Sequence, residues 1–186
     1  MRHLQAARGT AVAEKLGSAV ASPLRLRLLW AAVAVTGLTL DVVTKVIAVS
    51  QIDPGAPVRL LSGLLTLRLI RNPGAAFSQG QAFTAVFAVA AIGVLVFVIV
   101  RLVPRLGHPG WAVALGFLCA GVSGNLVDRL FRAPAPLRGH VVDFLQLPYW
   151  PIFNVADMCI STAAVMIVIL AIIKNVGVDG QRHGRD

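Results

Sequence analysis

Carboxylates placed within long apolar segments constrain this chain most. Its 186 residues include only eight Asp and Glu, and four of these lie inside or at the edges of hydrophobic stretches long enough to cross a bilayer: Asp41, Asp128, Asp143 and Asp157. A charge at the bilayer centre costs roughly 2.5–3.5 kcal/mol on insertion scales, so an aspartate kept there usually pairs, lines a polar cavity or performs chemistry. These four positions are therefore the first candidates for a functional site.

The composition indicates an integral membrane protein. Hydrophobic residues make up 57% of the chain and charged residues 13%, and the mean hydropathy of +0.79 lies outside the usual range for a soluble domain. A membrane-spanning helix needs roughly 20 residues, and four segments meet this length: about 28–49, 82–103, 111–127 and 155–173. The predicted fold class is an all-α membrane protein with four transmembrane helices.

The regions outside the spans define the domain organisation. Residues 28–174 form one membrane domain, preceded by residues 1–27, which we expect to be a disordered cytoplasmic extension, and followed by a cytoplasmic tail, residues 175–186. Ten Lys and Arg residues flank the spans on the side of the termini and six on the other side, which favours cytoplasmic N and C termini. The basic residues form no stripe with interleaved aromatics, so the net charge of +9 does not indicate nucleic-acid binding.

The two connections on the extracytoplasmic side predict a small β-sheet. Residues 65–69 alternate leucine with polar side chains, the period-two pattern of a half-buried strand, and Ser62-Gly63 is a plausible turn before them. The second connection has a proline-rich start and then the strand-like run 141–145. We expect these strands to form a cradle on the membrane surface.

Asp143 and Asp157 are the strongest candidates for a catalytic pair of carboxylates. Asn154 and Asp157 lie at i and i+3 where the fourth span begins, and Asp143 lies fourteen residues upstream of Asp157 on a returning loop. Two carboxylates brought together cannot comfortably both ionise, so one holds a proton while the other acts as a base toward water, as in an aspartyl hydrolase. The alternative is two unrelated interfacial aspartates that cap loops.

Charged residues on the first and third spans form two further clusters. Asp41 and Lys45 lie four residues apart on one helix face and can neutralise each other, chiefly as a structural pair, with orientation of neighbouring groups as the alternative. Asn125, Asp128 and Arg129 project from one helix end. There Asp128 either pairs with an arginine as an interfacial cap or belongs to the site, and Arg129 either joins the site or extends to water.

Glycines are found on the third span and in a turn before the second span. Gly121 and Gly124 on the third span allow another helix or a substrate to approach its backbone closely. Asn72-Pro73-Gly74 precedes the second span and, taken alone, is an ordinary turn.

Taken together and in order, five short segments form one pattern: Asp41-Val42-Val43-Thr44-Lys45, Asn72-Pro73-Gly74-Ala75-Ala76-Phe77, Gly124-Asn125-Leu126-Val127-Asp128-Arg129, Val141-Val142-Asp143-Phe144 and Phe153-Asn154-Val155-Ala156-Asp157. Each segment is a weak signal by itself. The ordered set, in a four-span chain of this length, resembles the motifs of the lipoprotein signal peptidases, also called signal peptidase II, over about residues 28–174. The stretch between Arg129 and Val141 is longer and more proline-rich than the usual connection in that family.

The resemblance implies an aspartyl endopeptidase of the bacterial cytoplasmic (inner) membrane. Such an enzyme removes the signal peptide from diacylglyceryl-modified prolipoproteins, with its active site facing the extracytoplasmic side. It implies Asp143 and Asp157 as the catalytic pair. The residues that would position the substrate and the carboxylates are Asn72, Asn125, Arg129 and Asn154, and the supporting residues would be Asp41, Lys45, Gly74 and Asp128. No metal or organic cofactor is required, the partners are prolipoproteins and membrane lipids, and a monomer is expected.

Three rival classes explain the sequence less well. Gly121-Val122-Ser123-Gly124 resembles the Gly-x-Ser-Gly of rhomboid serine proteases, but a serine nucleophile needs a base, all four histidines lie outside the spans, and six spans would be expected. A zinc peptidase would need a motif such as His-Glu-x-x-His, which the sequence lacks. A small ion- or proton-coupled transporter would use the intramembrane carboxylates, but the sequence has no repeats of the kind such transporters carry.

Overall fold

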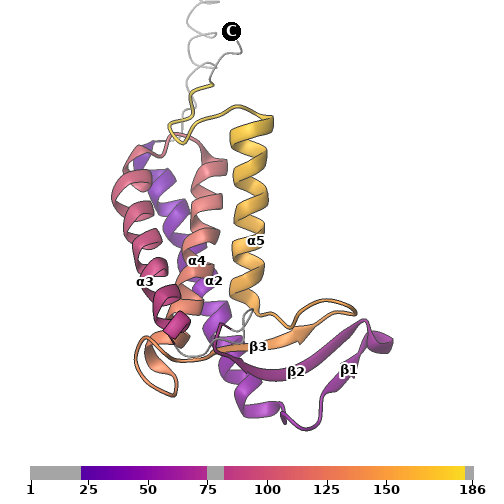
Figure 1. Ribbon diagram of the computed structural model, residues 1–186. Helices are drawn as coiled ribbons and strands as arrows, with labels where there is room; N and C mark the ends of the chain where they lie inside the picture. Colours follow the sequence, from indigo (N-terminus) through magenta and orange to yellow (C-terminus); the bar gives the residue numbers. More distant parts are fainter. Residues whose placement is uncertain (1–21, 75–81, 183–186) are drawn as a thin grey trace, which may run out of the picture.

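The computed structural model describes residues 22–74 and 82–182. Within them, four helices run side by side as a bundle (Figure 1): α2 (Pro23–Gln51), α3 (Ala82–Phe97), α4 (Pro109–Phe131) and α5 (Val155–Val168). Helical turns continue α3 to Arg105 and α5 to Ile173. Each of the four is long and apolar enough to cross a membrane, which confirms the prediction of a four-span membrane protein.

The first helix begins upstream of the predicted span. Its N-cap is Ser22, whose side chain accepts a hydrogen bond from the backbone N–H of Arg25 (3.4 Å). Pro23 occupies the first helical position, where the missing N–H is not needed. Residues 23–27 are therefore helical although the sequence pattern assigned them to a disordered extension, because a cap and a proline can start a helix ahead of its apolar run. Residues 1–21 of that extension lie outside the described residues.

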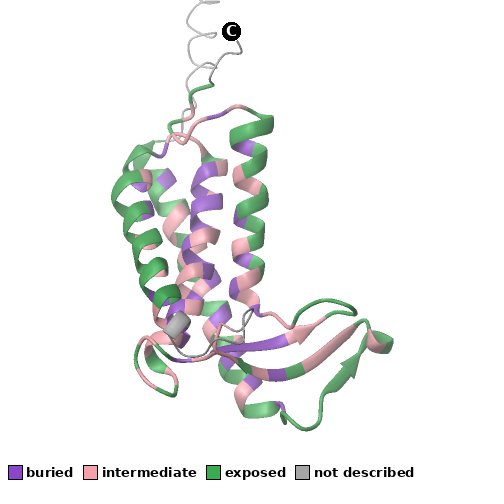
Figure 2. Cartoon of the chain, in the orientation of Figure 1, coloured by how far each residue is buried: buried purple, intermediate pink, exposed green. Residues whose placement is uncertain are grey.

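Helix α4 lies at the centre of the bundle. Of its most apolar 18-residue window 56% is buried, against 17–22% for the other three helices, and Figure 2 shows buried positions along α4 and exposed ones on the outer faces of α3 and α5. A Cβ added at Gly121 would collide with the backbone of Ala156 in α5, and one at Gly124 with the Asp41 carboxylate in α2. The two glycines thus allow the close helix approach that was predicted.

A three-stranded antiparallel sheet lies at one end of the bundle (Figure 1), in the order β1 (Val58–Leu60), β2 (Leu65–Asn72) and β3 (Val141–Gln146). The sequence predicts β2, β3 and the turn at Ser62-Gly63, where a short 3₁₀ turn lies. Strand β1 was not predicted, because three residues are too few to establish an alternation.

The inner part of the sheet is fixed against the membrane helices. Leu69 of β2 and Val142 and Phe144 of β3 are buried in one cluster with Ala48 and Ile52 from the end of α2. In the pairing of β2 with β3, Ile70 lies opposite Asp143. The sheet therefore holds Asp143 at the end of the bundle where α5 begins.

Residues after α5 fold back against the opposite end of the bundle. The indole Nε1 of Trp111 donates to the Val176 carbonyl (2.9 Å), and the Gly107 N–H donates to the Val178 carbonyl (2.9 Å). The predicted tail is thus packed on the bundle over residues 175–182, and residues 183–186 lie outside the described part.

Candidate active site

Asp143 is buried on β3 between two amide donors. Its side chain is 2% exposed. Asn72 Nδ2 donates to Oδ2 (2.9 Å) and Asn154 Nδ2 donates to Oδ1 (2.6 Å). Both predicted positioning residues therefore contact the carboxylate, and neither donor carries a formal charge.

Gly74 fixes the orientation of the Asn72 amide. Its backbone N–H donates to Asn72 Oδ1 (2.9 Å), which leaves Nδ2 to face Asp143. Gly74 has φ +95°, a conformation that favours glycine, and a Cβ there would lie 3.2 Å from the Phe87 ring. The turn is thus part of the site. Residues 75–77 of the same motif lie outside the described residues.

Burial dominates the electrostatics of Asp143. It raises the pKa of the carboxyl from 3.8 to about 6, and the charge of Asp157 acts in the same direction. The hydrogen bonds from Asn72 and Asn154 oppose this by stabilising the ionised form, without offsetting the burial. Asp143 therefore binds a proton far more readily than an exposed aspartate.

Asp157 lies in the first turn of α5, where it completes a capping box. Asn154 Oδ1 accepts from the Asp157 N–H (3.0 Å), and Asp157 Oδ2 accepts from the Asn154 N–H (3.1 Å). Its other oxygen, Oδ1, accepts from Asn125 Nδ2 (2.9 Å). The carboxylate is half-buried, so it is the more accessible of the pair.

Asn154 connects the two carboxylates. It is fully buried. One amide N–H donates to Asp143 and the other to Asn125 Oδ1 (3.1 Å), while its backbone N–H donates to Asp157. Asp143 and Asp157, fourteen residues apart in the chain, thus share one hydrogen-bonding residue, which is the proximity that the sequence pattern predicted.

Lys45 forms a second, cationic cluster beside this pair. Its ammonium lies 2.8 Å from Asp41 Oδ2, 2.8 Å from Asp128 Oδ2 and 3.0 Å from Asn125 Oδ1, so its three protons have three acceptors. Lys45 and Asp41 are 1% and 0% exposed. The predicted Asp41–Lys45 pair is present, but it also holds Asp128 and orients the Asn125 amide toward Asp157.

Each of the two carboxylates in this cluster accepts a hydrogen bond from the backbone N–H of the residue that precedes a candidate catalytic aspartate. Asp41 Oδ1 accepts from Ala156, the residue before Asp157 (2.8 Å). Asp128 Oδ2 accepts from Val142, the residue before Asp143 (3.1 Å). The cluster is thus bonded to both segments that carry the pair.

Two arginines near the site have different surroundings. Asp128 pairs with Arg132, the C-cap residue that follows α4, as the arginine-paired alternative anticipated. Arg129 is half-buried, with one terminal nitrogen donating to the Asn125 carbonyl (3.1 Å) and the guanidinium 5.8 Å from the centre of the Phe87 ring. Its Nε has no hydrogen-bond partner among the described residues. That nitrogen is buried, so the unpartnered donor lies inside the protein.

Three residues that contact the site were not predicted from the sequence. Arg132 lies four residues after Asp128, a spacing that identifies a helical ion pair. Thr84 and Phe87 on α3 contact the Pro73 carbonyl and Arg129 respectively. Neither has a sequence signal, because the packing of α3 on this turn depends on the tertiary fold.

Fold and site together define a multi-pass membrane protein with two amide-bonded aspartates, one on a surface sheet and one at a helix start. The family described as Signal peptidase (SPase) II matches residues 33–173. The chain therefore belongs to the signal peptidase II family, and the resemblance seen in the five motifs is confirmed.

Individual relatives agree with this assignment. The lipoprotein signal peptidase of Mycobacterium tuberculosis (strain ATCC 25618 / H37Rv) is 49% identical over 170 residues, covering 89% of this chain and 82% of that protein. The lipoprotein signal peptidase of Rhodococcus jostii (strain RHA1) is 45% identical, covering 90% and 85%. A bacterial membrane enzyme solved by the in meso method at 1.9 Å resolution is 28% identical, with a TM-score of 0.67 over 75% of this chain and 90% of that one.

Proposed function

We propose that this protein is an aspartyl endopeptidase that removes the signal peptide from diacylglyceryl-modified prolipoproteins. The observation that carries the proposal is the linkage of Asp143 and Asp157 through Asn154. The proposed setting is the bacterial cytoplasmic membrane, with both termini cytoplasmic and the sheet and active site on the extracytoplasmic side. The enzyme acts as a monomer, without metal or organic cofactor.

The proposed reaction divides two proton transfers between the aspartates. In the reactive form Asp143, whose pKa burial raises to about 6, holds a proton, and the more accessible Asp157 takes a proton from the attacking water. The water oxygen bonds to the scissile carbonyl carbon as Asp143 protonates the carbonyl oxygen. The C–N bond then breaks, the amine receives the proton held by Asp157, and Asp143 regains its own from the tetrahedral hydroxyl.

The surrounding donors have separate proposed roles. Both amide protons of Asn154 are used by Asp143 and Asn125, so Asn154 positions the pair rather than the substrate. Arg129 is half-buried and donates to the Asn125 carbonyl, so its guanidinium lies beside the pair, where it can bind a substrate carbonyl. Asn72 and Asn125 each orient one carboxylate.

The cluster of Lys45, Asp41 and Asp128 is proposed to position the two catalytic carboxylates. Through Val142 and Ala156, Asp128 and Asp41 hold the backbone immediately before each catalytic carboxylate. Small displacements of reacting groups cost large factors in rate. The cluster therefore contributes to catalysis without touching the substrate.

The test is to make Asp143→Asn and Asp157→Asn separately and to follow cleavage of a lipidated prolipoprotein by gel mobility. Each variant should lose at least about 1,000-fold in rate, since each removes a proton-transfer group. Asp53→Asn, an exposed aspartate in the first connection, is the matched control and should remain active. Near-normal turnover in either dyad variant, with native thermal unfolding, would overturn the assignment.

Two further measurements separate the rival functions. Ser123→Ala should keep substantial activity, and complete loss in a folded variant would instead favour a serine nucleophile. Liposomes containing the protein should take up no ions or protons beyond protein-free liposomes. Uptake that disappears in an Asp41→Asn variant would instead favour a transporter.

A further inference from the structure

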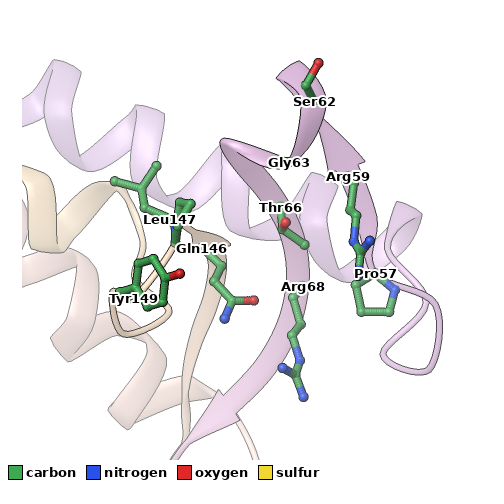
Figure 3. Close-up of a pocket in the computed structure, with 10 residues that line it drawn as sticks. Pro57, Arg59, Ser62, Gly63, Thr66, Arg68, Gln146, Leu147 and Tyr149 are labelled. Carbon is green, nitrogen blue, oxygen red and sulfur yellow. The ribbon is translucent and has the colours of Figure 1, made fainter.

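A hollow lies on the sheet, away from the aspartate pair. Its volume is about 660 Å³, and its walls come from β1, β2, the turn between them and the segment after β3 (Figure 3). The polar side chains lining it are Arg59, Ser62, Thr66, Arg68 and Gln146 together with Tyr149. All can donate hydrogen bonds and none is a carboxylate, so the hollow is built to receive acceptor atoms.

The two arginines bring an unneutralised positive charge to this hollow. Arg59 pairs with Thr66 across β1 and β2, and Arg68 is two residues further along β2, so the two side chains emerge as diagonal neighbours from one face of the sheet. Figure 3 shows them extending from the neighbouring strands, with Gln146 and Tyr149 across the hollow. Neither guanidinium has an ion pair among the described residues. An anion bound between them would relieve the like-charge repulsion.

Apolar side chains rim the same hairpin. Leu61 and Leu64, at the turn between β1 and β2, are 72% and 60% exposed, and Tyr149 and Trp150 after β3 are also exposed. Aromatic rings of this kind are enriched at the headgroup layer of a bilayer. The sheet extends from the end of the membrane-spanning bundle (Figure 1), so the hairpin lies where lipid headgroups are available.

We propose that the hollow lined by Arg59 and Arg68 binds the phosphate of an anionic phospholipid headgroup, while the leucines of the adjoining turn contact its acyl chains. A phosphodiester presents only acceptor oxygens, and guanidinium groups bind these in bidentate fashion. Serine and threonine hydroxyls at the hollow supply further donors. The bound lipid would hold the outer part of the sheet against the membrane surface.

A lipid fits the hollow better than the reacting part of a peptide substrate does. Arg68 lies four residues from Asn72 along β2, which corresponds to about 13 Å at the rise of a strand. The hollow is therefore beyond the groups that contact the aspartate pair. The proposal does not depend on the peptidase activity, because lipid binding is measurable without cleavage.

The experiment is native mass spectrometry of the purified protein in a neutral detergent, titrated with phosphatidylglycerol or with phosphatidylcholine of the same acyl chains. The double variant Arg59→Gln/Arg68→Gln is compared with Arg138→Gln, which removes an exposed arginine outside the hollow. We expect wild type to retain phosphatidylglycerol preferentially. The double variant should bind it about 30-fold more weakly, at roughly 1 kcal/mol per arginine, and Arg138→Gln should be nearly unchanged.

Three outcomes would overturn the proposal. The first is equal retention of the two lipids by wild type, and the second is an equal loss of phosphatidylglycerol in Arg138→Gln, which would indicate general surface charge. The third is unchanged lipid binding in the double variant with a raised KM for a prolipoprotein in lipid-free micelles, which would assign the hollow to the peptide. Soluble glycerophosphate should compete poorly, because it lacks the acyl chains that contact the turn.

Discussion

The four aspartates in and beside the membrane spans divide into two pairs with different surroundings. Asp41 and Asp128 contact the same ammonium, that of Lys45, and Asp128 also pairs with Arg132. Asp143 and Asp157 accept hydrogen bonds only from amides and backbone N–H groups, and no cation lies within ion-pair distance of either among the described residues. A cation fixes a carboxylate in its charged form, whereas neutral donors orient it and leave its protonation free to change.

This difference explains how one small membrane domain uses the same residue type for two purposes. Each ion-paired carboxylate also accepts a hydrogen bond from a backbone N–H. Asp128 accepts from Val142 and Asp41 accepts from Ala156. The amide-bonded pair remains available for proton transfer. The carboxylates that serve structure are thus held in direct ion pairs, and those for which chemistry is proposed have none among the described residues.

The largest expected effect comes from removing the cation of the first pair. Lys45→Met keeps the length of the side chain but leaves Asp41 uncompensated and Asp128 dependent on Arg132 alone. Breaking a buried ion pair from one side costs about 3–5 kcal/mol, so thermal unfolding of the detergent-purified variant should occur well below that of wild type. Cleavage should fall as well, because Ala156 and Val142 lose their supports.

Lys174→Met is the matched control for this change, because Lys174 is exposed after α5. It should unfold like wild type. A Lys45→Met protein as stable as this control would show that the ammonium does not hold the cluster together, and the contrast between the two pairs would fail.

The next largest effect is a change of stability with pH that arises from Asp143. Burial raises the pKa of Asp143 from 3.8 in the unfolded chain to about 6 in the fold, so between these values the folded protein binds more protons. The free energy of unfolding contributed by this group is therefore highest below pH 4 and falls as pH rises through 6. At about 1.4 kcal/mol for each pH unit, the loss is about 3 kcal/mol.

Asp143→Asn removes the titrating group and should abolish this part of the pH dependence. The measurement is thermal unfolding of both proteins from pH 4 to pH 7, comparing the slope of stability against pH rather than its absolute value. Parallel curves would mean that the Asp143 carboxyl titrates alike in the folded and unfolded states, and that the amide surroundings do not favour a proton.

The sequence predicted most of this division, for identifiable reasons. Asp41 and Lys45 lie on one helix face, and Asn154 and Asp157 share a capping spacing, so local periodicity reveals both contacts. The contact of Lys45 with Asp128, and those of Asp41 and Asp128 with Ala156 and Val142, join elements far apart in the chain. They depend on how closely α2, α4 and α5 pack, which no local spacing encodes. The same limit applies to the hollow on the sheet, since β1 was too short to predict.

The smallest expected effect tests whether amide donors tune the second pair. The hydrogen bond from Asn72 stabilises the ionised form of Asp143 and so lowers its pKa. Asn72→Ala should therefore raise that pKa above about 6. If catalysis requires protonated Asp143, the basic limb of the kcat/KM profile should move to higher pH, while the maximal rate falls by about tenfold or less, as expected for one hydrogen bond worth roughly 0.5–1.5 kcal/mol. Gln51→Ala, which removes an exposed amide at the end of α2, should leave the profile in place. A limb that stays fixed or moves to lower pH in Asn72→Ala would assign the titrating proton to a different group.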